Sequence, residues 1–127
     1  MTNIFTFGSN EIGRHGAGAA KYAVDHHGAI FGKGNGMQGS SYGIPTKDGN
    51  LKPLPLNSIK EYVRQFIQFA RRSQNLTFDV TRIGCGLAGY TDEQIAPMFL
   101  NAPKNCHFPL EWKSILGEDF QYHELRG

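Results

Sequence analysis

The chain has 127 residues, of which 39% are hydrophobic and 19% charged, with a formal net charge of +2 and two widely separated cysteines, Cys85 and Cys106. The length suits a single domain over residues 1–127, and the mild charge argues against a nucleic-acid-binding protein with a basic stripe. There is no apolar run near the roughly 20 residues of a membrane span, no signal-peptide pattern and no metal-ligand spacing of cysteines, so we expect a cytoplasmic, reduced protein.

The first part of the chain alternates predicted strands with one helix. Residues 4–8 predict a short buried strand, and residues 16–28 predict a helix with a small apolar face. Further strands are expected at 30–31 and 41–44, on either side of a flexible glycine-rich loop. The second of these strands leads to Lys47, so that this lysine is expected at the carboxyl end of a strand.

The second part continues the alternation. A capping-box pattern, Ser58 with Glu61, begins the clearest helix, at 58–75, and 78–83 predicts the next strand. A second capping box, Thr91 with Gln94, begins a helix at 91–99 that Pro97 shortens or breaks. Residues 105–109 predict a last strand, while 110–127 give no clear pattern. The order of strands and helices predicts an α/β domain with a largely parallel central sheet.

Glycine is unusually frequent, with 16 residues gathered at 8–18, 28–43 and 84–89. The first and last clusters fall where a strand passes into a helix, which is where α/β sheets bind ligands. Helix N-termini bind anions, and glycine lets a ligand approach the backbone closely. The first loop has neither the GxGxxG nor the P-loop spacing, so alone it fits a phosphate loop and a plain tight turn equally. Together the two loops predict a site that clamps a diphosphate from both sides.

Five side chains near these loops each allow two interpretations. Lys47 points at the same edge of the sheet as the loops, or it is a solvated lysine in a turn. His15 contacts the ligand or faces solvent, and Tyr90 stacks on the ligand or stays at the rim. Cys85 is better explained as a small packed residue than as a nucleophile, and Asp92 as a residue that caps a helix rather than a catalytic acid.

Four segments in this order resemble a macrodomain, the ADP-ribose-binding α/β/α module: FGSN ending at Asn10, GRHGAGAAKYA, IPTK and RIGCGLAGY. The similarity covers residues 4–99. It is closest to the branch that holds terminal ADP-ribose glycohydrolases and DNA ADP-ribosyl glycohydrolase antitoxins. The chain also resembles a group of small uncharacterised bacterial and phage proteins. The resemblance implies a three-layer α/β/α fold with a mostly parallel sheet, shortened at the N-terminus.

The resemblance also assigns roles to individual residues. Asn10 would contact the distal ribose, and Lys47 would attack or stabilise its anomeric carbon, which makes these two the expected catalytic residues. The Asp that binds adenine in macrodomains is missing, and Ala88 stands where some members of the branch have an Asp. No cofactor or metal is implied. The expected ligand-binding residues are Ser9, Asn10, His15, Gly16, Ala17, Gly18, Gly84, Cys85, Gly86, Leu87, Ala88, Gly89 and Tyr90.

The expected function is hydrolysis of an ADP-ribosyl bond on nucleic acid, protein or a small ADP-ribose derivative. The expected partner is therefore ADP-ribose or an ADP-ribosylated substrate, with DNA as one candidate, and no membrane interaction is expected. A second hypothesis is a non-catalytic binder of ADP-ribose or of an NAD-derived signalling nucleotide. A third is a binding domain for an unrelated nucleotide. Only the first of the three needs Lys47, and the oligomeric state is not predicted.

Overall fold

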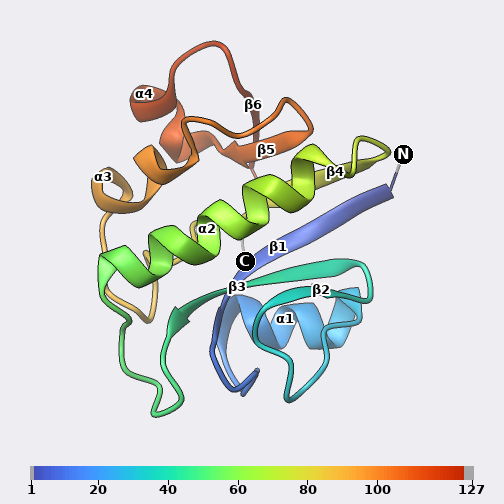
Figure 1. Ribbon diagram of the computed structural model, residues 1–127, viewed down its shortest axis with the longest axis vertical. Helices are drawn as coiled ribbons and strands as arrows, with labels where there is room; N and C mark the ends of the chain where they lie inside the picture. Colours follow the sequence, from blue (N-terminus) through green and yellow to red (C-terminus); the bar gives the residue numbers. More distant parts are fainter. Residues whose placement is uncertain (1, 125–127) are drawn as a thin grey trace.

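A six-stranded sheet with the order β2-β3-β1-β4-β5-β6 forms the middle of the computed structural model, which describes residues 2–124 (Figure 1). All neighbouring strands are parallel except β2 and β3, which are antiparallel. The predicted α/β class and mostly parallel sheet are confirmed. The strands are β1 (Thr2–Asn10), β2 (Gly36–Gln38), β3 (Ser41–Lys47), β4 (Leu76–Val80), β5 (Cys106–Pro109) and β6 (Gln121–His123).

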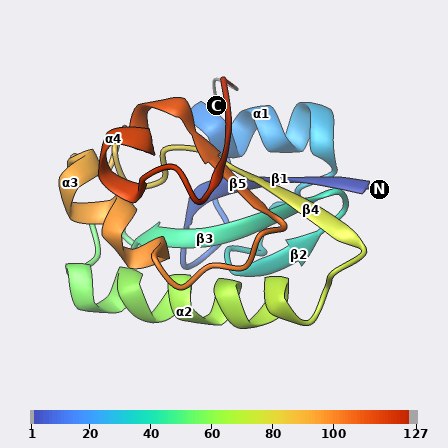
Figure 2. The same ribbon diagram turned by 90° about the horizontal axis from the view of Figure 1, so that it is seen from above.

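Helices lie on both faces of the sheet. Figure 2 shows α1 (Gly18–His27) on one face and α2 (Leu56–Arg71) on the other, which gives the three layers. The larger core lies on the α2 side, where Phe66, Phe78 and Phe108 are fully buried. The smaller core, under α1, contains Phe5, Phe7, Ala20, Ala23 and Ala29. The remaining helical elements are α3 (Asp92–Ile95), η1 (Ala96–Phe99), η2 (Leu110–Trp112) and α4 (Lys113–Leu116).

The two predicted capping boxes have different outcomes. At α3, Thr91 Oγ1 accepts a hydrogen bond from the Gln94 main-chain N–H at 3.2 Å, and Gln94 Oε1 accepts one from the Thr91 N–H at 3.0 Å, as predicted. At α2 the prediction is wrong, because the helix begins at Leu56 and has no side-chain cap. Ser58 therefore lies inside the first turn, where it cannot cap. The predicted break at Pro97 is confirmed, since α3 ends at Ile95 and a 3-10 turn follows.

The predicted strand at residues 30–31 is wrong. Ile30 and Phe31 lie in an exposed turn, with 52% and 61% of their surface accessible, and the edge strand is β2 instead. The glycine-rich loop that we expected to be flexible packs closely against the end of β1. A Cβ atom on Gly34 would lie 2.0 Å from the carbonyl oxygen of Asn10. This glycine cluster therefore serves close backbone packing.

The tail without a sequence pattern completes the sheet. After η2 and α4 the chain returns as β6, which pairs in parallel with β5. Trp112 from η2 is fully buried in the larger core. Residues 125–127 of that tail lie outside the described part of the chain. Among residues 2–124, no helix combines the length and the apolar character needed to cross a membrane.

One buried amide joins α2 to β4. Asn105 Nδ2 lies 2.9 Å from the Ala70 carbonyl oxygen and 3.1 Å from those of both Ser73 and Leu76. It thereby satisfies carbonyl groups at the end of α2 and in the connection to β4. Removing this amide would abolish these buried side-chain hydrogen bonds, so that the Ala70 and Ser73 carbonyl oxygens would keep only their main-chain donors.

We predict that Asn105→Ala lowers the free energy of unfolding by about 2–3 kcal/mol, measured by urea denaturation. The matched control is Asn101→Ala, because Asn101 is exposed. The control should stay within about 0.5 kcal/mol of the wild type. Equal stability of the Asn105 variant and the control would show that the three contacts do not support the fold.

Candidate functional site

A cavity of about 650 Å³ lies at the carboxyl ends of β1, β3 and β4. The chain leaves β1 toward β3 on one side and leaves β4 toward β5 on the other, so the loops after β1 and β4 diverge. Such a switch point opens a crevice at the edge of an α/β sheet. The lining consists of Gly8, Ser9, Asn10, Arg14 and residues 16–20 after β1; Thr46, Lys47 and Leu51 at the end of β3; residues 81–88 after β4; and Glu111.

The loop after β1 brings the N-terminus of α1 to the cavity. Ala17 is the N-cap residue of α1, it provides no side-chain cap, and the first turn contains no acidic residue. Within the described chain, the main-chain N–H groups of residues 16–20 donate no hydrogen bond. These donors and the positive end of the helix dipole therefore remain available to an anion.

The loop after β4 presents a second set of donors. Gly84 has a φ of +73°, and a Cβ atom on it would lie 3.1 Å from Ile95 Cδ1, so glycine is required there. Hydrogen bonds from Tyr90 N to Gly84 O, at 2.8 Å, and from Gly89 N to Gly86 O, at 3.0 Å, close the loop. The N–H groups of residues 86–88 have no acceptor among residues 2–124. They form a concave set of donors of the kind that binds anions.

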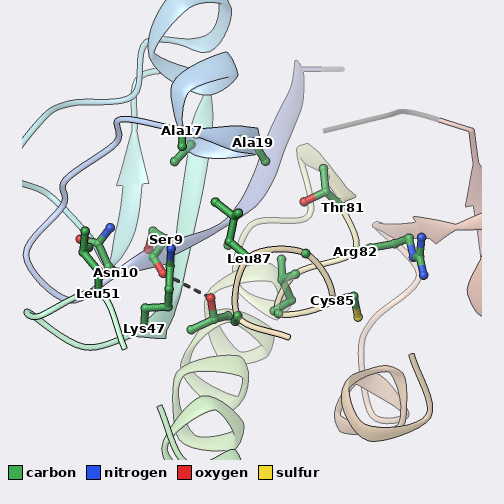
Figure 3. Close-up of a pocket in the computed structure, with 18 of the residues that line it drawn as sticks. Ser9, Asn10, Ala17, Ala19, Lys47, Leu51, Thr81, Arg82, Cys85 and Leu87 are labelled. Atoms are coloured by element: carbon green, nitrogen blue, oxygen red, sulfur yellow. Dashed lines mark hydrogen bonds between the residues drawn. The ribbon is translucent and has the colours of Figure 1, made fainter. Parts of the chain in front are cut away.

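The two loops approach each other through Leu87. This side chain is 70% exposed at the tip of the second loop. Its Cδ1 atom lies 3.7 Å from the position of a Cβ atom on Gly18, at the start of α1. Figure 3 shows Leu87 between Ala17 and Ala19 on one side and the loop with Cys85 on the other. Leu87 therefore spans the opening between the two sets of main-chain donors.

The two expected catalytic residues are direct neighbours in the sheet. Asn10, the last residue of β1, pairs with Lys47, the last residue of β3. The Asn10 side chain holds the first loop, because its Nδ2 donates to the Arg14 carbonyl oxygen and its Oδ1 accepts from the Arg14 N–H, both at 2.8 Å. Lys47 is half-buried and lies beside Ser9 in Figure 3.

Three of the expected binding residues lie outside the cavity lining: His15, Gly89 and Tyr90. His15 is neither in contact with the cavity nor facing solvent. It is fully buried, and its Nε2 lies 2.9 Å from the Lys33 carbonyl oxygen and 3.1 Å from Gln38 Oε1. The Tyr90 hydroxyl donates to the Leu54 carbonyl oxygen at 2.5 Å, which directs the ring to the core. The other expected residues all line the cavity.

An ion pair joins the two ends of the second loop. Arg82 Nε and Nη2 lie 3.0 and 2.8 Å from the two carboxylate oxygens of Asp92, and Trp112 Nε1 donates to Asp92 Oδ1 at 2.7 Å. Burial alone would raise the pKa of Asp92, but the hydrogen bonds from Arg82 and Trp112 outweigh it and lower that pKa. Asp92 does not line the cavity, so its contacts support a role in fixing the loop.

Some lining residues were not found from the sequence. The predicted strand 78–83 extended too far, whereas β4 ends at Val80, so Thr81 and Arg82 leave the strand and reach the cavity. If the strand had been predicted to end at Val80, Thr81 and Arg82 would have been expected in the loop that borders the cavity. Leu51 and Glu111 had no such signal, because a turn and the folded tail bring them there. Within residues 2–124, no three His, Cys, Asp or Glu side chains are arranged to hold a metal ion.

No family model and no curated protein matches this chain. Two solved structures from Bacteroides thetaiotaomicron are similar in fold. One, described as a protein of unknown function, is 18% identical, with a TM-score of 0.57 over 78% of this chain and 78% of that one. The other is 16% identical, with a TM-score of 0.55 over 79% of this chain and 80% of that one. At these identities the similarity concerns the fold alone.

The thiol of Cys85 should react slowly. Burial, followed by the carboxylate of Asp92, raises the pKa of Cys85 to about 12. We predict that iodoacetamide alkylates it at pH 8 roughly a thousandfold more slowly than an ordinary exposed cysteine, because the thiolate is the reactive form.

Mass spectrometry on a Cys106→Ala background isolates this reaction, since Cys106 is the other cysteine. Asp92→Asn should accelerate it by removing the carboxylate that raises the pKa of Cys85. Rapid alkylation of the parent protein at pH 8 would contradict the prediction.

Proposed function

We propose that this protein binds ADP-ribose in the cavity and hydrolyses the bond that attaches ADP-ribose to a nucleic acid, a protein or a small molecule. One observation carries the proposal. Unpaired main-chain N–H groups at residues 16–20 and at residues 86–88 line the same cavity from two different loops. A ligand that satisfies both sets needs anionic acceptor oxygens on two sides, and a diphosphate has them.

The size of the cavity suits this ligand. Its volume of about 650 Å³ lies in the range of small-molecule sites. The resemblance of the two loops, Asn10 and Lys47 to a macrodomain selects ADP-ribose among diphosphates. The sugar beyond the diphosphate is then expected at the end of the cavity where β1 and β3 finish.

The chemistry assigned to Lys47 begins with its uncharged amine, which attacks the anomeric carbon. The leaving group departs with the electron pair of the broken bond and takes up a proton. Water then adds to the anomeric carbon and the bond from this carbon to the lysine nitrogen breaks. The nitrogen keeps the electron pair and takes a proton from the water, which frees both the lysine amine and ADP-ribose. The amide of Asn10 keeps one N–H and one lone pair beyond its two bonds to Arg14, and these can hold a ribose hydroxyl.

A non-catalytic binder of ADP-ribose or of an NAD-derived nucleotide is the second candidate. One observation favours it. Among the described residues that line the cavity, Glu111 is the only carboxylate, and it pairs with Arg82 at 4.0 Å. Hydrolysis usually employs a base that activates water. Ala88 stands where some members of the resembling branch carry an Asp, so this carboxylate is absent from the second loop.

Gly86 gives a direct test of binding. A Cβ atom on Gly86 would meet no atom within 4 Å, so valine fits the free protein without disturbing the fold. Its side chain would occupy space that the ligand needs. We predict that Gly86→Val weakens ADP-ribose binding by about 100-fold or more, with Gly86→Ala intermediate, measured by calorimetry.

The melting temperature of both Gly86 variants should stay within a few degrees of the wild type. AMP and NAD serve as comparison ligands. Tight binding by Gly86→Val would place the diphosphate elsewhere, and equal affinity for AMP and ADP-ribose would favour an unrelated nucleotide-binding domain.

Substitution of Lys47 distinguishes the two candidate functions, hydrolysis of an ADP-ribosyl bond and binding without catalysis. We predict that Lys47→Ala keeps its ADP-ribose affinity within about tenfold, because main-chain groups hold the diphosphate. It should lose several powers of ten in the rate of ADP-ribose release from ADP-ribosylated DNA or protein.

Lys52→Ala is the matched control, since Lys52 is exposed and outside the lining, and it should retain activity. If the wild type binds ADP-ribose but hydrolyses no member of a broad substrate panel, the protein is the binder. A fully active Lys47→Ala variant would remove the role assigned to Lys47.

A further inference from the structure

The turn after β3 places an apolar side chain in the cavity. Leu51 lines the cavity together with Lys47 and is 38% exposed. Figure 3 shows Leu51 on the side of Asn10 and Lys47, with Arg82 on the opposite side. Leu51 therefore belongs to the end of the cavity where the bond to ADP-ribose is expected to break.

The backbone of Leu51 is strained. Its φ is +63°, and it is the only non-glycine residue with a positive φ among residues 2–124. In this region the Cβ atom of leucine lies too close to the following carbonyl oxygen, a cost that glycine avoids. At every other such position in the described chain the residue is glycine. A leucine here needs a reason beyond the turn itself.

Hydrogen bonds around Asp48 hold the turn in this shape. Asp48 Oδ1 accepts from the N–H groups of Asn50, at 2.8 Å, and Lys52, at 3.0 Å. Its carbonyl oxygen accepts from Leu51 N at 3.0 Å, and its own N–H donates to the Lys52 carbonyl oxygen at 2.8 Å. These hydrogen bonds fix the turn without any contribution from the leucine side chain. The side chain is therefore not needed for the turn and lines the cavity instead.

The polar side chains at this end are held in position by main-chain groups. The Ser9 hydroxyl donates to the Gly34 carbonyl oxygen, and the Asn10 amide is held by the main chain of Arg14. Resting on the proposed function, we infer that Leu51 determines which group is released from ADP-ribose. Its side chain forms an apolar wall beside Lys47 that favours an uncharged ring over a group that leaves as a carboxylate.

The difference between the two leaving groups lies in their contact with Leu51. In either hydrolysis the bond to the anomeric carbon breaks, its electron pair leaves with the group, and water supplies a hydroxyl to the carbon and releases a proton. The nucleobase keeps this proton on its ring, whereas the carboxylate gives it up to solvent. A ring packs its face on the leucine and buries apolar surface. A carboxylate loses hydration against a side chain that cannot donate a hydrogen bond. Arg14, which also lines the cavity, attracts a carboxylate more than an uncharged ring, and its contribution is the same with either residue at position 51.

The test compares Leu51→Gly with the wild type on two substrates, ADP-ribose linked to a nucleobase and ADP-ribose linked through an ester. We expect kcat/KM for the ring-linked substrate to fall about tenfold and that for the ester to change less than about threefold. The affinity for free ADP-ribose should stay within about threefold. The melting temperature should rise by a few degrees, because glycine relieves the strain.

Leu100→Gly is the matched control, because Leu100 is an exposed leucine outside the cavity lining with an ordinary φ of −59°. It should show neither the gain in melting temperature nor the change in selectivity. An equal fall for both substrates, or no change in either, would overturn the inference, and so would a Leu51→Gly variant no more stable than the wild type.

A further measurement distinguishes failure of the proposed hydrolysis from failure of the inference about Leu51. If the wild type binds ADP-ribose but hydrolyses neither substrate, the dissociation constants of the two linked probes take the place of rates. The ring-linked probe must then bind more tightly, and Leu51→Gly must remove this preference. Equal binding of both probes overturns the inference, as does a wild type that does not bind ADP-ribose at all.

Discussion

The parallel pairing of β1 with β3 and with β4 is the constraint on which the cavity depends. It sets three strand ends at one edge of the sheet, and the register places Asn10 directly beside Lys47. The loops that follow β1 and β4 then run apart, and within them the N–H groups of residues 16–20 and 86–88 have no main-chain acceptor among residues 2–124. The donors and the lysine belong to three separate segments, and only the sheet brings them together. Any change that shifts this register moves all of them at once.

The sequence predicted the features that depend on local pattern. The alternation of strands and helices, the capping box at Thr91 and both glycine loops follow from short stretches of chain, and the structure contains each of them. One local pattern, the capping box at Ser58, was wrong because α2 begins two residues earlier, at Leu56. Other errors lie where contacts between distant parts of the chain determine the structure. Residues 30–31 have the composition of a strand, but the edge of the sheet is filled by β2. His15 is in a loop by its sequence, yet Lys33 and Gln38 bury it. Glu111 reaches the cavity only because the tail folds back.

The glycine clusters have different physical purposes, and composition alone does not separate them. At Gly16, in the loop after β1, and at Gly86, in the loop after β4, there is room beside the backbone, because a Cβ atom on either would meet nothing within 4 Å. In the segment before β3, Gly34 and Gly39 instead allow close backbone packing, because a Cβ atom on Gly34 would lie 2.0 Å from the Asn10 carbonyl oxygen and one on Gly39 would lie 2.5 Å from that of Gly28. Because Gly16 and Gly86 also line the cavity, the open space beside them gives a ligand access to the backbone.

The two faces of the sheet are anchored unequally. The α2 face rests on large aromatic side chains, whereas α1 rests on Phe5, Phe7 and three alanines. Less apolar surface is buried under α1, so this layer is expected to open at a lower free energy than the rest of the molecule. The N-terminus of α1 is also one wall of the cavity. An anion bound there would contact both α1 and the loop after β4, and would stabilise the α1 layer. Ligand binding would therefore make this layer unfold together with the rest of the molecule rather than before it.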